Sequence, residues 1–142
     1  MTSARIVLTT IGQKQDAEKL ALQLVERRLA ACVNIVGPIR SVYRWKQKVS
    51  NEPEYLLVIK TTAEHSAQLQ SAFKELHPYE LPECIEVAVQ GGSEEYLAWL
   101  AGEVSGLSVG RAVENQSPPF GFTQGRLRHR EHGVLISIEF SP

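Results

Sequence analysis

The chain has 142 residues, of which 43% are hydrophobic and 22% are charged, a composition that supports one sizeable core but not two. Its formal net charge of −1 gives no general cationic field for nucleic-acid phosphates or anionic lipid head groups, so we expect no nucleic-acid partner. No stretch approaches the roughly 20 apolar residues that span a bilayer, so we expect no membrane partner either.

The N-terminal half predicts a strand, a helix and a long hairpin. Residues 5–10 are a short β-branched run followed by turn residues. Apolar side chains then recur at helical spacing over residues 17–25, and we expect this helix to end near Ala30. Residues 32–45 alternate loosely and contain β-branched and aromatic side chains, and residues 54–61 form a continuous apolar run, which predicts two further strands.

The hairpin formed by these two strands is unusually long. Its first strand, residues 32–45, is more than twice the length of a typical strand of about 5 or 6 residues, and we expect the connection near residues 46–51. Pro38 cannot donate a ladder hydrogen bond, so we expect a bend or bulge there. A strand of this length reaches beyond a single small sheet, which favours pairing with another subunit.

The following segment predicts a helix, a strand and a third helix. Residues 69–76 carry an amphipathic helical stripe that stops before Pro78, as the conformational restriction on pre-proline residues requires. Residues 84–89 predict the fourth strand. A last helical stripe begins near Ser93 and ends before Gly106.

The predicted order is βαββαβ with an extra C-terminal helix. Two helices on one face of an antiparallel sheet make an α+β, ferredoxin-like domain, which we place at residues 1–104. After Gly106 the composition shifts to Ser, Gly, Pro and Arg, so we expect residues 105–142 to form a largely disordered tail. Within this tail, residues 134–140 alternate in hydrophobicity and fit a strand that could join an exposed sheet edge.

The two cysteines, Cys32 and Cys84, make a poor disulfide framework and suit a reducing compartment. The N-terminus also lacks the long apolar region of a secretory signal, so we expect a cytoplasmic protein. Cys32 with His77 is the only conceivable nucleophilic dyad, and no nucleophile motif surrounds this cysteine. We therefore expect no enzymatic activity.

The most site-like stretch runs from His77 to Glu83, where an imidazole, a phenol and a carboxylate lie among prolines. In the alternative interpretation this stretch is a rigid connection in which His77 satisfies the C-terminal carbonyls of the helix. The domain's other soft ligands, His65, Cys32 and Cys84, show no tight metal-binding spacing. A metal site is therefore better supplied by a symmetric assembly that brings several copies of His77, or a neighbour's carboxylate, together.

Two aromatic pairs, Tyr43 with Trp45 and Tyr96 with Trp99, also stand out. Aromatic side chains on a sheet of this topology stack RNA bases in RNA-recognition modules. The strand at residues 55–60 lacks the basic, glycine-rich pattern of those modules, so packing in the core or at an interface is the favoured interpretation.

Five motifs together resemble one protein family. They are Leu29-Ala-Ala-Cys-Val-Asn34, Ser41-x-Tyr43-x-Trp45, Glu54 followed by Ile59-Lys60-Thr61-Thr62, His77-Pro-Tyr-x-x-Pro-Glu83, and Tyr96-Leu-x-Trp99. Their order and spacing resemble the CutA divalent-cation tolerance family. The resemblance implies a ferredoxin-like subunit, a homotrimer built by strand pairing through the long hairpin, and architectural kinship with the PII signalling proteins.

The resemblance also implies a role for metal ions. The family is associated with copper binding, through a cysteine late in the first strand and paired histidines before the Pro-Tyr. This chain has Thr9 and Leu76-His77 at those places, so the implied site for copper or another divalent cation is His77 with an oxygen donor such as Glu83. Gln47 stands where the family commonly has glycine, so we expect a differently looped hairpin tip.

The resulting expectation is a homotrimer that binds a metal ion or small ligand in clefts between its subunits. The residues expected to line or support these clefts are Tyr43, Trp45, Glu54, Lys60, His77, Tyr79, Tyr96 and Trp99. Glu54 and Lys60 equally fit a structural ion pair. The alternative is a structural or PII-like signalling trimer with no physiological metal, and His129-Arg-Glu-His132 in the tail is a candidate accidental chelator.

Overall fold

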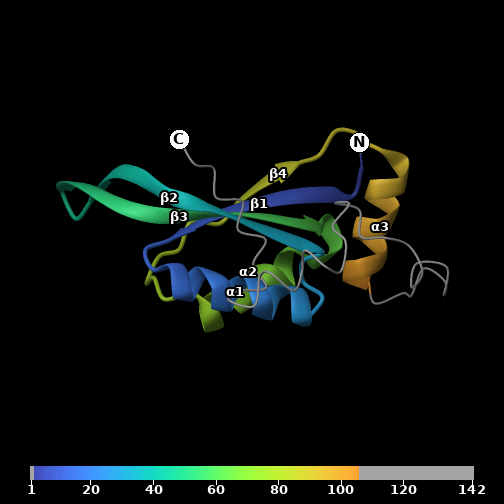
Figure 1. Ribbon diagram of the computed structural model, residues 1–142, viewed down its shortest axis with the longest axis horizontal. Helices are drawn as coiled ribbons and strands as arrows, with labels where there is room; N and C mark the ends of the chain where they lie inside the picture. Colours follow the sequence, from blue (N-terminus) through green and yellow to red (C-terminus); the bar gives the residue numbers. More distant parts are fainter. Residues whose placement is uncertain (1, 106–142) are drawn as a thin grey trace, which may run out of the picture.

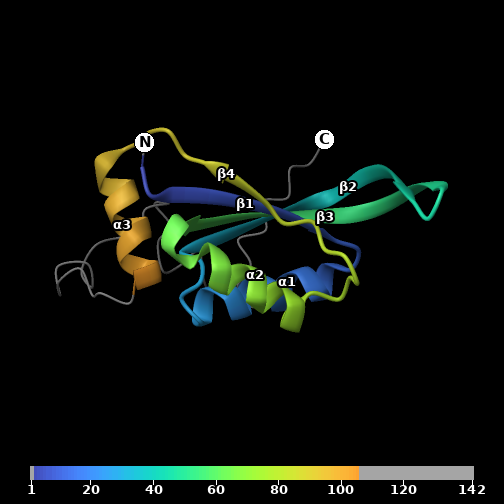
Figure 2. The same ribbon diagram turned by 180° about the vertical axis from the view of Figure 1, so that it is seen from behind.

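The computed structural model describes residues 2–105. Two helices cover one face of a four-stranded antiparallel sheet, and a third helix stands at the end of the sheet farthest from the hairpin tip (Figures 1 and 2). The elements are β1 (Ala4–Ile11), α1 (Lys14–Glu26), β2 (Cys32–Trp45), β3 (Lys48–Thr62), the short 3-10 helix η1 (Ala63–His65), α2 (Ser66–Leu76), β4 (Ile85–Ala88) and α3 (Glu94–Ser105).

The sheet has the strand order β2-β3-β1-β4, and every neighbouring pair is antiparallel. This order and the βαββαβα succession confirm the ferredoxin-like α+β fold with an extra C-terminal helix. The predicted amphipathic helices and the four strands are all present, although β4 is shorter than the predicted residues 84–89. The predicted tail, residues 105–142, lies outside the described residues except for its first residue, and so does the strand predicted at residues 134–140.

The core lies between the sheet and helices α1 and α2 (Figure 1). Alternate residues of three strands point toward the helices, as the two-residue period of a strand requires, while the helical stripes supply the other side. The buried side chains include Val7, Ile11, Val33, Ile35, Leu57 and Ile59 from the strands, Leu20 and Leu24 from α1, and Leu69 and Phe73 from α2.

Helix α1 ends at Glu26, four residues before the predicted end near Ala30. Arg28 adopts a left-handed conformation with φ 57°, and the N–H of Leu29 donates to the carbonyl of Leu24 at 2.9 Å. This is the hydrogen-bonding pattern of a Schellman cap. The sequence did not reveal it because such caps are usually signalled by glycine, and here an arginine occupies the left-handed position.

The hairpin differs from the prediction at its tip. Only Lys46 and Gln47 connect the strands, both with positive φ (48° and 68°), so β3 begins at Lys48 and the predicted connection over residues 46–51 was too long. Two consecutive positive φ values are typical of a type I′ hairpin turn. The expectation that Gln47 forces a different loop was also wrong, because Gln47 takes the left-handed conformation that glycine would take.

The bend predicted at Pro38 is confirmed. The Gly37–Pro38 peptide is cis, and the register of β2 on β3 shifts between Val36 and Ile39. Beyond this shift, residues 39–45 pair only with residues 48–54, whereas the rest of β3 also pairs with β1. We call residues 39–54 the arm. It projects from the body of the molecule in both views (Figures 1 and 2).

The second face of the sheet is only partly covered by the described residues. Ile6, Leu8, Leu56 and Val58 lie on the side away from α1 and α2, and all four are half-buried. On the neighbouring edge strand β4, Ile85 and Val87 are 52% and 44% exposed. None of the helices within residues 2–105 is long and apolar enough to cross a lipid bilayer.

Candidate ligand cleft

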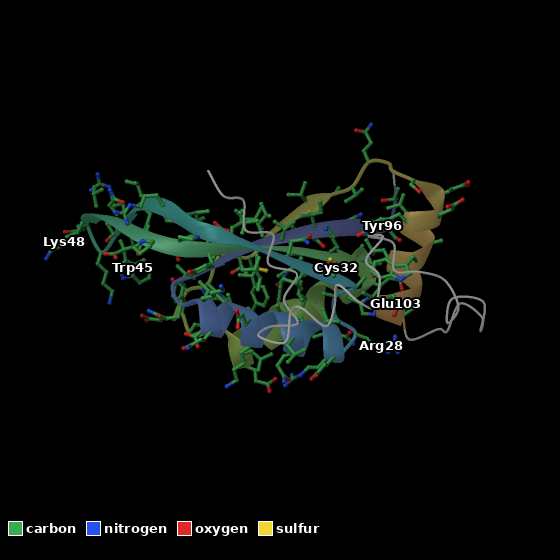
Figure 3. All side chains as sticks on the ribbon, viewed as in Figure 1. Arg28, Cys32, Trp45, Lys48, Tyr96 and Glu103 are labelled. Atoms are coloured by element: carbon green, nitrogen blue, oxygen red, sulfur yellow. The ribbon has the colours of Figure 1, made fainter. Side chains whose placement is uncertain are left out.

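A cleft of about 760 Å³ lies between the arm and the segment that follows α2. It contains aromatic rings, carboxylates and one guanidinium, a mixed surface within the usual volume range for small-molecule sites. The lining residues are Thr10 from β1, Arg40, Ser41, Val42, Tyr43, Trp45 and Glu54 from the arm, and Pro78, Tyr79, Glu80, Leu81 and Glu83 from the segment after α2. Trp45 lies near the tip of the arm (Figure 3).

Glu54 is the buried carboxylate at the base of this cleft. It is 5% exposed, and its Oε2 accepts a hydrogen bond from the hydroxyl of Tyr79 at 2.6 Å. Burial, followed by the neighbouring Glu54, raises the pKa of Tyr79, so this phenol keeps its proton and donates it. Within residues 2–105, no Lys, Arg or His forms an ion pair with Glu54.

The structural ion pair between Glu54 and Lys60 is not formed. Six residues separate them along β3, which places them roughly 20 Å apart on an extended strand. The ammonium of Lys60 instead makes a short hydrogen bond to the side-chain oxygen of Asn34 and lies 3.9 Å from the sulfur of Cys32. Glu54 is therefore left without the cation that the sequence suggested for it.

His77 lies beneath the cleft and is 7% exposed. Its Nδ1 accepts the backbone N–H of Tyr79 at 3.1 Å, and its Nε2 is 3.0 Å from the hydroxyl oxygen of Thr9. Because Nδ1 accepts, the neutral ring carries its proton on Nε2 and donates it to Thr9. Burial lowers the pKa of His77, which favours this neutral form.

The metal site predicted at His77 and Glu83 stays a prediction. Both ring nitrogens of His77 have hydrogen-bond partners, whereas Glu83 is exposed and lines the cleft. No group of three or more His, Cys, Asp or Glu side chains that could hold a metal ion occurs among residues 2–105. Thr9, at the place where the resemblance implies a cysteine ligand, is fully buried against His77.

The remaining predicted cleft residues lie at the other end of the molecule. Tyr96 and Trp99 are on α3, with ring centroids 5.5 Å apart, and Tyr96 lies beside Cys32 (Figure 3). Lys60 belongs to the same region through its contact with Cys32. The structure thus brings Tyr43, Trp45, Glu54 and Tyr79 together around one cleft, while Lys60, Tyr96 and Trp99 lie outside it.

The Cys32 and His77 dyad is not assembled. Cys32 pairs in register with Lys60 on the sheet face turned away from α1 and α2, whereas Thr9 and His77 are on the helix side. Burial also raises the pKa of the Cys32 thiol, with Lys60 opposing this effect, so the reactive thiolate is disfavoured.

Sequence reasoning missed Arg40 and Glu80 as cleft residues. Glu80 lies inside the site-like stretch from His77 to Glu83, so the sequence pattern could have indicated it. Arg40 had no such signal, because the relation of the arm to the segment after α2 comes from the chain reversal at Lys46 and Gln47 and from the bend at Pro38.

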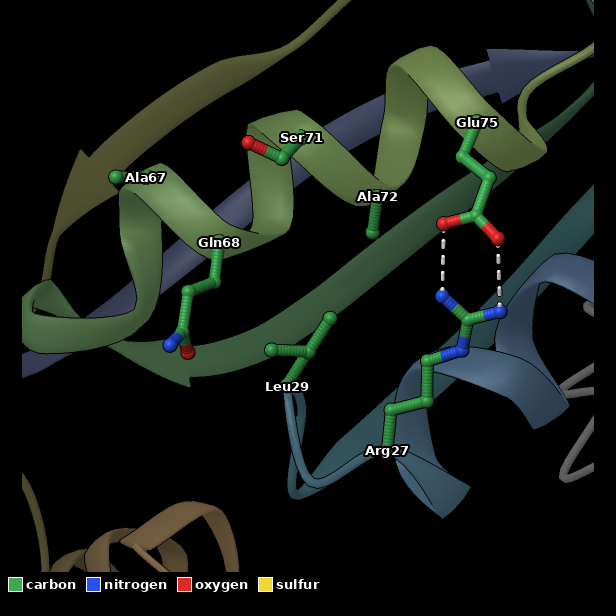
Figure 4. A pocket seen from close by; sticks show the side chains of 7 residues that line it. All are labelled: Arg27, Leu29, Ala67, Gln68, Ser71, Ala72 and Glu75. Carbon is green, nitrogen blue, oxygen red and sulfur yellow. Dashed lines mark hydrogen bonds and ion pairs between the residues drawn. The ribbon is translucent and has the colours of Figure 1, made fainter.

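A second hollow of about 340 Å³ lies between the C-terminal end of α1 and helix α2. Arg27 and Glu75 form a two-pronged ion pair across it, with N–O distances of 3.0 and 3.2 Å (Figure 4). Its charged groups already satisfy each other, and apart from this pair its lining has no titratable side chain. The cleft at the arm is therefore the better candidate site.

The fold and this cleft define a ferredoxin-like domain that carries a projecting hairpin arm. Residues 5–103 match the family model described as CutA1 divalent ion tolerance protein. The chain belongs to this family.

Similar proteins support the assignment. The divalent-cation tolerance protein CutA of Thermus thermophilus is 44% identical over 95 residues, which cover 67% of this chain and 92% of the relative. The chloroplastic protein CutA of Arabidopsis thaliana is 42% identical over 67% of this chain but only 52% of its own length. None of these names is that of an enzyme.

Solved structures show the same fold. A Cut A1 structure from Thermus thermophilus has a TM-score of 0.69 at 42% identity and covers 70% of this chain and 97% of its own. A CutA structure from Archaeoglobus fulgidus, described as periplasmic, has a TM-score of 0.68 at 32% identity and covers 71% and 98%. Because relatives carry chloroplastic and periplasmic descriptions, the cytoplasmic location of this chain stays a prediction.

Proposed function

We propose that this divalent-cation tolerance protein is a homotrimeric binding module whose clefts at the arms take a small ligand or a metal ion. The observation that carries the proposal is the buried carboxylate of Glu54 in a cleft of ligand-binding size, with no cationic partner among residues 2–105. A buried charge without a counter-charge is costly, so a bound cation would stabilise it.

The trimer is supported by surface that a lone subunit leaves uncovered. On the arm, Val42 and Val49 are 65% and 64% exposed. The half-buried apolar face of the sheet continues onto the exposed side chains of β4, and both β2 and β4 are edge strands of the sheet formed by residues 2–105. Unpaired edges and apolar arms of this kind are typical sites of strand addition between subunits, and a head-to-tail interface of this kind gives a closed ring when its rotation closes.

Copper binding is part of the same proposal and rests on His77 and Glu83. For His77 to bind a metal, Nε2 must give up its proton and its hydrogen bond to Thr9, which weakens any such site. A structural or PII-like signalling trimer without a physiological metal remains the second candidate, and the neutral, hydrogen-bonded state of His77 is the observation that favours it.

Native mass spectrometry of the full chain tests both the proposed trimer and the proposed copper binding. We expect a trimer for the unmodified chain and for Val25→Lys, whose exposed valine lies on α1, and a monomer for Val42→Lys on the arm. Copper(II) titration should give one specific ion per subunit that is lost in His77→Gln. Uptake lost instead in His129→Ala/His132→Ala would make the metal adventitious, and a monomeric unmodified chain would contradict the assembly.

A further inference from the structure

The cleft at the arm has a chemistry that selects among ligands, and this step rests on the proposed binding function. We infer that its ligand is a small organic cation, with an ammonium or guanidinium group against Glu54 and an apolar body against the aromatic rings of the arm. Three observations support this inference: the position of Glu54, the balance of charge and the nature of the walls.

Glu54 shares one face of the arm with the aromatic residues. In the β2–β3 register, Glu54 is opposite Ile39, and Tyr43 and Trp45 follow Ile39 at alternate positions on the same side. Tyr79 approaches from the segment after α2 and donates to one carboxylate oxygen only. An ionised carboxylate accepts several hydrogen bonds, so a donor-rich cation that enters the cleft can use the remaining capacity.

The balance of charge around the cleft favours a cation over an anion. Its lining includes the carboxylates of Glu54, Glu80 and Glu83 but only one guanidinium, that of Arg40. Arg40 is exposed and pairs in register with Pro53. This pair is next to the Ile39–Glu54 pair, so Arg40 and Glu54 are on opposite faces of the arm. The net field inside the cleft is therefore negative close to the buried carboxylate.

The walls favour an organic cation over a bare metal ion. Tyr43, Trp45 and Tyr79 all line the cleft, and aromatic faces attract ammonium and guanidinium groups through their quadrupoles. Rings do not supply the oxygen, nitrogen or sulfur donors that divalent metals require, and no group of three such ligands occurs among residues 2–105. The volume of about 760 Å³ also leaves room for a ligand much larger than a single ion.

Agmatine, a four-carbon chain with a guanidinium at one end and an ammonium at the other, is a suitable probe for the full chain. Glutarate and 1,5-pentanediol serve as anionic and neutral ligands of similar length. The chain has two tryptophans, so in Trp99→Phe the fluorescence of Trp45 alone reports on the cleft. We expect agmatine to change this fluorescence saturably and to raise the melting temperature, and the two comparison ligands to do neither.

The variants locate the interaction. Glu54→Gln keeps the size of the side chain and removes its charge, and should weaken agmatine binding at least tenfold. Glu64→Gln removes an exposed carboxylate from η1, outside the cleft lining, and should leave binding unchanged. If Glu54→Gln does not fold, the chain that keeps Glu54 still decides the charge selectivity, through the comparison of agmatine with glutarate and pentanediol.

The outcomes separate this inference from the proposed function. A trimer that binds glutarate or copper(II) in the cleft but not agmatine, or one that binds agmatine equally well in Glu54→Gln, overturns the organic-cation inference and leaves a binding module. A trimer with no response to any probe also overturns it. A monomer with no response overturns the proposed function as well.

Discussion

Thr9 and His77 form a buried polar pair that joins the first strand to the end of α2, although they are 68 positions apart in sequence. The imidazole is held neutral between the hydroxyl of Thr9 and the backbone N–H of Tyr79. At the level of single residues, His77 is therefore a structural support for the segment that carries Tyr79 toward Glu54. It is also the C-cap residue of α2, where its backbone N–H, and not its imidazole, donates to the carbonyl of Phe73.

The buried imidazole makes stability depend on pH. Because the pKa of His77 is lowered in the folded state, the unfolded chain takes up a proton first as the pH falls below about 6.5. Its contribution to stability is present above pH 6.5 and is lost as the pH falls from there to the folded-state pKa.

Urea unfolding between pH 5 and 8 measures this loss. His77→Gln cannot titrate at this position, so the unmodified chain should lose stability more steeply than the variant on acidification. His65→Gln is the matched control, since His65 is less buried and sits in η1. Parallel pH profiles for the unmodified chain and His77→Gln would contradict the buried, neutral state.

At the scale of elements, the tip of the arm carries an avoidable backbone cost. Gln47 has φ 68°, in the region that glycine adopts without steric penalty. Gln47→Gly should raise the free energy of unfolding by about 0.5–1 kcal/mol. The control Lys48→Gly is in β3, where glycine weakens a strand, and should be destabilising. A Gln47→Gly variant that loses stability in urea unfolding would argue against the two-residue turn.

The elements also show what sequence patterns can and cannot predict. The apolar stripes of α1 and α2 and the bend at Pro38 were predictable, because burial imposes a period and proline removes a donor. The end of α1 at Arg28 and the turn at Lys46 and Gln47 were not, because non-glycine residues occupy left-handed positions there.

The candidate site was predictable only in part. Local composition indicated the aromatic residues of the arm and the stretch from His77 to Glu83, and both border the cleft. Local composition could not predict that these residues lie far from Lys60, Tyr96 and Trp99. The distance arises because the arm is at one end of β3 and Lys60 is near the other. The hydrogen bond between Tyr79 and Glu54 likewise depends on contacts 25 positions apart in the chain.

For the whole molecule, the proposed trimer should couple stability to concentration. When a trimer unfolds into three chains, the free energy of unfolding rises by about 0.9 kcal/mol per protomer for each tenfold increase in protein concentration. This is two-thirds of the roughly 1.4 kcal/mol that corresponds to a factor of ten. For a domain of this size we expect the melting temperature to rise by roughly 4–7 °C per decade. Calorimetry over two decades should show this rise for the unmodified chain and none for Val42→Lys. A melting temperature independent of concentration in both would count against subunit association.

Helix α3 stands at the end of the described domain opposite the arm, so its last residue, Ser105, lies far from the candidate cleft (Figures 1 and 2). The guanidinium of Arg28 donates to the carbonyl of Glu103 at 3.0 Å, which holds this end of α3 against the domain. For protein engineering, this arrangement is useful: a fluorescent protein or surface linker that replaces residues 106–142 would be attached at the end of α3, away from the mouth of the cleft. A sensor that reads ligand occupancy through Trp45 would then be immobilised at that end of the described domain.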